Sequence, residues 1–215
     1  SGARLLAAAV TFSGEGGISV PDSSQEKSGI CAASILKSWS PNEIQALLDL
    51  GIFNDVIYRA VRFRHREIRE LLTAEWLLSL LNEGQSRQTI ESLIFQEKYG
   101  EKVITPRLRP VLSWLILFDP EIRERALKLD PNIAIEGGDI SQLPVTDRRR
   151  ILVDIVDQIA VDEDGRTARD NAAIARIAQP DLSDVTLQLI QKYKENDDVI
   201  FFLGRLVWQG NLTIC

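Results

Sequence analysis

Residues 58–81, YRAVRFRHREIRELLTAEWLLSLL, change from the pattern of a strand to the pattern of a helix. Apolar and basic residues first alternate, with Val61, Phe63 and His65 on one face and Arg62 and Arg64 on the other. Apolar residues then recur every three or four positions, which predicts an amphipathic helix over 66–81. Its predicted apolar face is formed by Ile68, Leu71, Leu72, Leu78 and Leu81, and Arg66, Glu67, Arg69 and Glu70 lie on the predicted solvent side.

The sequence before this segment predicts short helices and a β-ribbon. Residues 3–12 are apolar and fit a short helix or strand, and residues 30–39 fit a helix. Ser40, Pro41 and Glu43 have the spacing of a capping box with proline at the first helical position, so a helix begins there and ends near Gly51. Residues 52–53 and 56–63 then predict a small hairpin around Asn54 and Asp55. Two short helices followed by a ribbon is the order expected of a winged helix.

After residue 84 the pattern predicts helix after helix, with no convincing strand. Proline follows a capping residue at Thr105, Asp119 and Asp130, and each pair predicts a helix start. The predicted helices cover 87–98, 106–118, 121–129, 132–135, 146–159, 167–178, 182–194 and 199–208. The fold class is therefore mainly α: a winged-helix-like module with a small β-hairpin over 1–84, then α-solenoid-like, HEAT-like helical repeats over 85–215.

Composition limits the classes of function. The 215 residues carry a net charge of −6, which argues against general nucleic-acid binding. The cysteines Cys31 and Cys215 have no metal-ligand spacing, and a reducing, cytoplasmic location is the simpler expectation. No apolar run reaches the ~18 residues that a membrane span needs. The chain begins Ser-Gly-Ala and contains no methionine, so we expect it to be part of a longer protein.

The central segment resembles a family signature. Phe63, His65, Glu70, Leu72, Ala74 and Leu77 match the pattern FxHxxxxExLxAxxL. This pattern follows the nucleotide-binding domain in STAND-class NTPases, particularly NACHT-like bacterial ones. In that family the signature joins a winged-helix domain to a helical-repeat array. The resemblance is firm over 61–77 and extends more loosely over about 30–155.

One departure from the family is large. No phosphate-binding loop G-x-x-x-x-G-K-[ST] is present, and Gly14-Glu15-Gly16-Gly17 lacks the lysine. The resemblance therefore implies a nucleotide-binding domain upstream in the same polypeptide, with ATP or ADP bound there. We expect no cofactor and no ATP hydrolysis in this chain.

His65 has two interpretations. It is the only histidine, and it could be a partly buried residue that caps the helix or bonds a backbone group. The resemblance implies a different role, because related proteins use a winged-helix histidine to contact the phosphates of ADP and keep the resting state closed. Imidazole suits this task since its charge-assisted bond to phosphate is strong but breakable.

The arginines beside His65 also have two interpretations. Arg62 and Arg64 could contact an anion or a neighbouring domain. Alternatively, they form a solvated face with Glu67 and Glu70, where each exposed ion pair contributes under ~1 kcal/mol. The three arginines 148–150 are expected at the exposed start of a helix.

Other patterns predict no site. Residues 162–165, DEDG, have the composition of a calcium loop, but the alternate-position ligands and the glutamate at loop position twelve are missing, so we predict a turn and no metal. Catalytic residues are not predicted, because one histidine and two remote cysteines supply no catalytic pair. Trp39, Trp76, Trp114 and Trp208 fall in predicted helices and are expected to be packing residues.

Two functions follow from these patterns. The first is a regulatory and coupling fragment of a STAND NTPase in signalling or defence, in which His65 senses the nucleotide and the repeats respond. The second is a HEAT-like scaffold that binds a protein partner and has no nucleotide role. An enzyme is a third possibility that no residue pattern favours.

Overall fold

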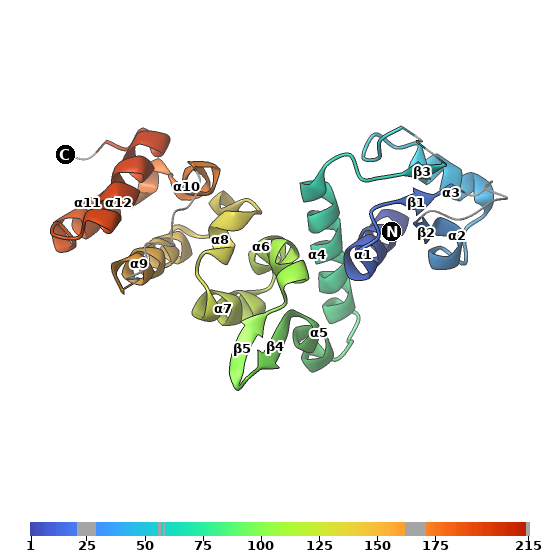
Figure 1. Ribbon diagram of the computed structural model, residues 1–215, viewed down its shortest axis with the longest axis horizontal. Helices are drawn as coiled ribbons and strands as arrows, with labels where there is room; N and C mark the ends of the chain where they lie inside the picture. Colours follow the sequence, from blue (N-terminus) through green and yellow to red (C-terminus); the bar gives the residue numbers. More distant parts are fainter. Residues whose placement is uncertain (21–28, 56, 58, 162–170, 214–215) are drawn as a thin grey trace. The chain divides into compact units, whose positions relative to one another are not determined.

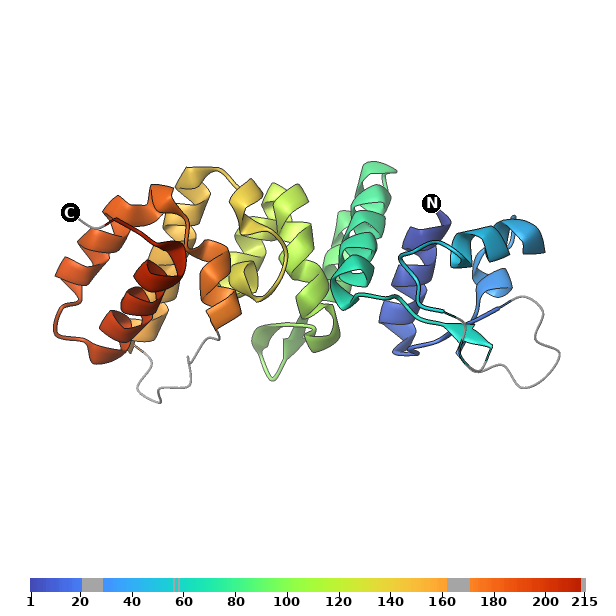
Figure 2. The ribbon, with the colours of Figure 1, turned by 90° about the horizontal axis from the view of Figure 1, so that it is seen from above.

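The computed structural model describes residues 1–20, 29–55, 57, 59–161 and 171–213, and most of these residues are α-helical (Figures 1 and 2). The prediction of a mainly α protein is confirmed. The chain divides into two compact units, Ser1–Phe118 and Asp119–Cys215. The predicted boundary at residue 84 falls inside the first unit.

The first unit combines helices with two small sheets. Its elements are α1 (Gly2–Ser13), β1 (Ile18–Ser19), β2 (Ile30–Cys31), α2 (Ala32–Ile35), α3 (Pro41–Leu48), β3 (Ala60–Val61), α4 (Arg66–Asn82), α5 (Arg87–Ile94), β4 (Phe95–Lys98), β5 (Glu101–Ile104), the 3-10 turn η1 (Pro106–Leu108) and α6 (Arg109–Phe118). In the first sheet β1 is central, pairing in parallel with β2 and antiparallel with β3.

An apolar core joins this sheet to α1, α2 and α3. The buried residues of the cluster are Leu6, Val10, Ile18, Ala32, Leu36, Ile44, Leu47, Leu48, Phe53 and Val61. Because a two-residue strand gains little from its own hydrogen bonds, burial of this apolar surface is what holds the sheet together.

The capping box at α3 is confirmed. The backbone N–H of Glu43 donates to the Ser40 side chain at 3.4 Å, and the Ser40 N–H donates back to the Glu43 carboxylate at 2.7 Å. The predicted helix over 30–39 is wrong in extent. Ile30 and Cys31 pair as a strand with β1, and only Ala32–Ile35 is helical.

Helix α4 is confirmed and is packed on two sides, by α1 and by α6. Its buried residues are Glu70, Thr73, Ala74 and Leu77. The prediction that Glu70 faces solvent is therefore wrong, because coverage from two sides buries a stripe of the helix that the leucine pattern did not mark. The packing of α6 on α4 also explains why the first unit continues past residue 84.

The antiparallel hairpin β4–β5 was not predicted, and the predicted helix over 87–98 ends at Ile94. The chain reverses through Tyr99 and Gly100, whose φ angles of 56° and 82° are both positive. Positive φ at both central residues defines the turn whose twist matches paired strands. Thr105 then donates its hydroxyl to the Leu93 carbonyl at 2.7 Å, which closes the base of the hairpin.

The second unit is helical throughout its described residues. Its elements are α7 (Pro120–Leu129), α8 (Ile133–Glu136), η2 (Ile140–Gln142), α9 (Val145–Val161), α10 (Asn171–Ile177), η3 (Pro180–Leu182), α11 (Ser183–Lys192) and α12 (Asp197–Gly210). The predicted start at Asp119 is confirmed, since its carboxylate accepts the Ile122 N–H at 2.9 Å. The predicted turn over 162–165 lies outside the described residues.

Two predictions about exposure in this unit are wrong. Arg148 is buried rather than exposed, and its guanidinium donates to both carboxylate oxygens of Asp181, at 2.8 and 2.6 Å, and to the Leu143 carbonyl at 3.0 Å. Trp208 is 70% exposed, because it lies on the outer face of α12 while Leu203 and Leu206 face the core.

Across the described ranges, every helix is too short or too polar to cross a lipid bilayer.

Replacing Tyr99 by asparagine should stabilise the protein. Asparagine tolerates the left-handed conformation that costs tyrosine about 1 kcal/mol, and the fully exposed tyrosine ring contributes no burial. We expect the free energy of unfolding of Tyr99→Asn, measured by urea denaturation, to rise by about 1 kcal/mol. Tyr99→Ala is the control and should show no such gain; equal values for the two variants would contradict this account of the turn.

The Arg148–Asp181 pair should make stability depend on pH. The Arg148 guanidinium lowers the pKa of the Asp181 carboxyl. The pair therefore stabilises the folded protein fully at pH values above about 3.9, the pKa of Asp181 in the unfolded chain. This stabilisation is lost as the pH falls through the lower pKa of Asp181 in the folded protein. Because Arg148 is buried but the Asp181 side chain is half exposed, Asp181→Asn should cost roughly 1–2 kcal/mol at pH 7.

Unfolding of wild type and Asp181→Asn by urea at pH 7 and at pH 2.5 measures this effect. The difference between the two proteins should shrink at pH 2.5. A difference that is the same at both pH values would show that the charge of Asp181 is not responsible.

Candidate functional site

The candidate site is built on the ribbon of residues 52–64. The Asn54 N–H donates to the Arg62 carbonyl at 2.9 Å, and the Arg64 N–H donates to the Ile52 carbonyl at 2.8 Å. The Phe53 and Phe63 rings pack with centroids 4.8 Å apart. The two segments are therefore paired antiparallel, as predicted, but the bridge between Ile57 and Ala60 places the turn later than Asn54 and Asp55.

The ribbon is tied to the core and then turns into α4. Strand β3 within it pairs with β1, and Val61 is buried in the core cluster. His65 follows with extended backbone angles of φ −124° and ψ 133°, and α4 begins at Arg66. The change from strand period to helix period therefore occurs at the predicted place.

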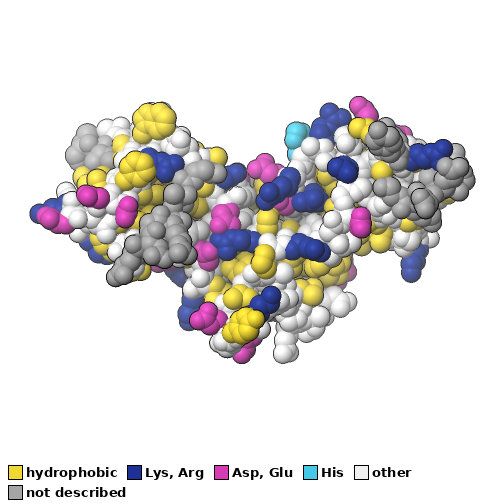
Figure 3. Space-filling model, viewed as in Figure 1, with side chains coloured by type: hydrophobic (Ala, Val, Ile, Leu, Met, Phe, Trp, Pro, Cys, Tyr) yellow, Lys and Arg dark blue, Asp and Glu magenta, His cyan; other side chains and the backbone are white. Residues whose placement is uncertain are grey.

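His65 is exposed at this junction, where the histidine is coloured cyan in Figure 3. Its side chain makes no capping hydrogen bond to α4. Among the described residues the imidazole has neither a hydrogen-bond nor an ion-pair partner. The capping interpretation of His65 is therefore wrong, and its contact with a nucleotide stays a prediction.

The arginines near His65 differ in what they contact. The Arg64 guanidinium donates twice to the Phe53 carbonyl, each time at 3.3 Å, so it braces the ribbon. The Arg66 guanidinium donates to the buried carboxylate of Glu70, and this bond raises the pKa of Arg66. The Arg62 guanidinium is exposed and contacts no hydrogen-bonding or charged partner in the part of the chain that the structure describes.

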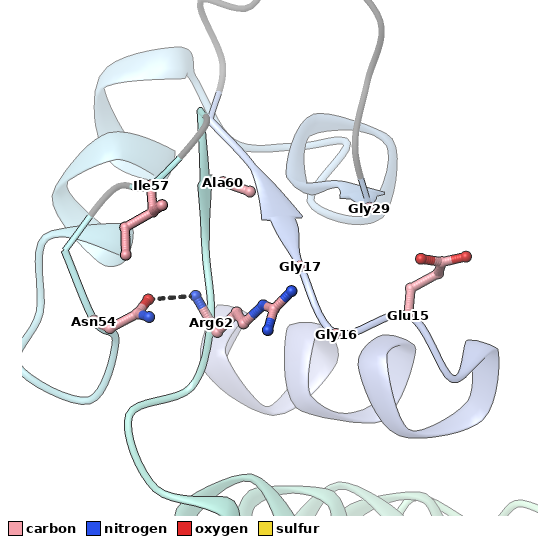
Figure 4. Close-up of a pocket in the computed structure, with 8 residues that line it drawn as sticks. All are labelled: Glu15, Gly16, Gly17, Gly29, Asn54, Ile57, Ala60 and Arg62. Atoms are coloured by element: carbon pink, nitrogen blue, oxygen red, sulfur yellow. Dashed lines mark hydrogen bonds between the residues drawn. The ribbon is translucent and has the colours of Figure 1, made fainter.

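Arg62 lines a cavity of about 390 Å³ (Figure 4). The described lining residues are Glu15, Gly16, Gly17, Gly29, Asn54, Ile57, Ala60 and Arg62. Of these, the sequence singled out Arg62 as an anion contact. The glycine-rich segment was noticed only because it lacks the lysine of a phosphate-binding loop. Asn54 was expected as a turn residue, and no sequence pattern indicates that its side chain bonds the backbone of Arg62.

A second cavity, of about 520 Å³, lies between α7 and α9. Most of its charged groups are paired: Arg150 donates to the Glu124 carboxylate at 2.7 and 2.9 Å, and Lys192 donates to Asp157 at 3.3 Å. Burial raises the pKa of the Asp154 carboxyl on the same wall. We regard this network as structural, because Arg150, Glu124 and Asp157 are paired within the unit.

Within the described ranges, no group of three histidine, cysteine or acidic side chains is arranged to hold a metal ion. Comparison with protein-family models, with curated proteins and with solved structures finds no match for this chain. The geometry of the ribbon and its junction is therefore the basis for a function.

The two ribbon arginines should differ in their effect on stability. Arg64→Gln removes hydrogen bonds to the Phe53 carbonyl and should lower the free energy of unfolding by about 1 kcal/mol. Arg62→Gln removes a side chain that has no partner among the described residues. It should change the free energy of unfolding by less than about 0.5 kcal/mol. Urea denaturation measures both, and an equal loss in the two variants would contradict the assignment of Arg64 as the brace.

Proposed function

We propose that this chain is the winged-helix and helical-repeat region of a STAND-class NTPase, and that it couples the nucleotide state of an upstream domain to sensor repeats. One observation carries the proposal. The histidine of the family signature is exposed, has no partner among the described residues, and lies at the junction between a braced ribbon and α4.

The arrangement of the first unit supports a winged-helix module. The order is helix α1, strands β1 and β2, helices α2 and α3, and then the ribbon, whose strand β3 returns to pair antiparallel with β1. The second unit supports a repeat array, since short helices follow one another with short connections from α7 to α9 and from α10 to α12.

The proposed mechanism is a nucleotide-dependent contact. In the resting state His65 donates a hydrogen bond to a phosphate of ADP held by the upstream domain. Exchange of ADP for ATP removes this contact and releases the module. The contact biases the resting state only by the difference in its affinity for the two states. Because α4 begins directly after His65 and packs on α1 and α6, displacement of the junction would be transmitted through these helices.

His65→Ala in the full-length protein should therefore release ADP faster. A hydrogen bond to a charged group is worth about 1.5–3 kcal/mol, so the off-rate should rise roughly tenfold or more. Stopped-flow measurement with a fluorescent ADP analogue tests this, with Arg64→Gln as a variant of the same ribbon that leaves the imidazole in place. An unchanged off-rate in His65→Ala would overturn the proposed contact.

The reading frame upstream of the codon for Ser1 provides an independent test. The proposal requires a phosphate-binding loop there. Its absence would favour the second function, a scaffold that binds protein.

The scaffold function has one observation in its favour. Phe201 and Trp208 are 68% and 70% exposed and lie seven positions apart on one face of α12. Arg205 lies between them, over the Phe201 ring at 5.5 Å. Exposed aromatic residues flanking an arginine are the composition found at centres of protein interfaces.

A further inference from the structure

The cavity beside Arg62 is lined by three glycines, Gly16, Gly17 and Gly29. Gly16 and Gly17 form one wall, and a Cβ atom at Gly16 would lie 3.8 Å from the Arg62 guanidinium, which therefore rests against the glycine backbone (Figure 4). Gly29 approaches so closely that a Cβ atom there would lie 2.3 Å from the Gly17 carbonyl oxygen. The Gly17 carbonyl accepts the Ile30 N–H at 2.9 Å, so this part of the wall is paired main chain with no side chain in the way.

Asn54 fixes the backbone of Arg62 from the opposite wall. The Asn54 side-chain oxygen accepts the Arg62 N–H at 2.6 Å, and the Asn54 N–H donates to the Arg62 carbonyl at 2.9 Å. Both N–H groups of the Asn54 side-chain amide remain available to a ligand, because the amide nitrogen has no hydrogen-bond partner among the described residues. The cavity thus presents a guanidinium and an amide donor from a ribbon whose backbone is held in place.

The charges and the apolar lining together define a ligand class. Glu15 also lines the cavity but lies beyond ion-pair distance of Arg62, and in Figure 4 its carboxylate is turned away from the guanidinium. Ile57 and Ala60 give one side an apolar surface. The volume of about 390 Å³ falls within the range of small-molecule sites, about 300–1,000 Å³.

We propose that this cavity binds a small phosphate monoester, with its phosphate on Arg62 and Asn54 and its organic group against Ile57 and Ala60. Arginine matches a phosphate with two parallel N–H donors, and such bonds are among the stronger ones in proteins. The site does not depend on the proposed contact between His65 and ADP, since the lining contains neither His65 nor Arg64.

Phenyl phosphate is a suitable probe, titrated into the 215-residue protein by isothermal calorimetry at fixed ionic strength in phosphate-free buffer. We expect Arg62→Gln to weaken binding at least tenfold. Arg64→Gln is the matched control, because this arginine lies two positions along the same ribbon and is engaged by the Phe53 carbonyl, and it should bind within about twofold of wild type.

A second variant keeps the test independent of Arg62. Asn54→Asp preserves the oxygen that accepts the Arg62 N–H but puts a carboxylate in the cavity, so it should also weaken binding at least tenfold. Inorganic phosphate should bind more weakly than phenyl phosphate. The proposal is overturned if phenyl phosphate does not bind at millimolar concentration, if Arg62→Gln and Arg64→Gln lose affinity equally, or if inorganic phosphate binds as well as the ester.

Discussion

The packing of α4 between α1 and α6 is the constraint on which the first unit depends. Ala74 and Leu77 are fully buried on this helix, and the small Ala74 lets neighbouring backbones approach closely. Polar contacts fix the register of α1 against α4. The buried Thr11 and Thr73 hydroxyls lie 3.1 Å apart, and the Arg4 guanidinium donates to the Glu75 carboxylate at 2.8 Å. Since α4 starts directly after the ribbon, the same packing fixes where the ribbon ends and where His65 emerges.

The buried carboxylate of Glu70 adds to this constraint. It accepts a hydrogen bond from Arg66 one turn earlier, so the first turn of α4 is braced although His65 provides no cap. A buried charge needs such a partner, because its transfer from water is costly. This pairing leaves the imidazole of His65 without a structural task at the helix start. An exposed side chain with no task in the fold is available for contact with another molecule, and this is why the junction, rather than the core, carries the proposed function.

How far the sequence predicts this fold depends on whether the determining interactions are local. Helix starts at Ser40 and Asp119 were predictable, because a capping residue and the N–H groups it bonds lie within three positions. The change from strand to helix after His65 was predictable for the same reason, since it follows from the spacing of apolar residues that are close in sequence.

Strand β2 was not predictable from local pattern. Ile30 and Cys31 form a strand only because they pair with β1, which lies earlier in the sequence. The pattern of residues 95–98 predicts a helix, and no Asn-Gly or Asp-Gly pair marks the turn at Tyr99 and Gly100.

Arg62 and His65 could be selected as candidate site residues from the sequence. The cavity could not be predicted, since its walls come together only when β1 and the ribbon pair.

The ribbon gives Arg62 and His65 a common support but different surroundings. The Phe53–Phe63 contact and the paired backbone hold both residues, and Arg64 between them is used to brace the strand rather than to bind. Arg62 faces a cavity formed with the glycine-rich segment, whereas His65 stands clear of it at the start of α4. A ligand in the cavity would contact the ribbon on both of its segments, through Asn54 and Arg62. The pairing and the ring contact already hold the ribbon, so a side chain can be changed at Arg62 or at His65 without removing the support of the other.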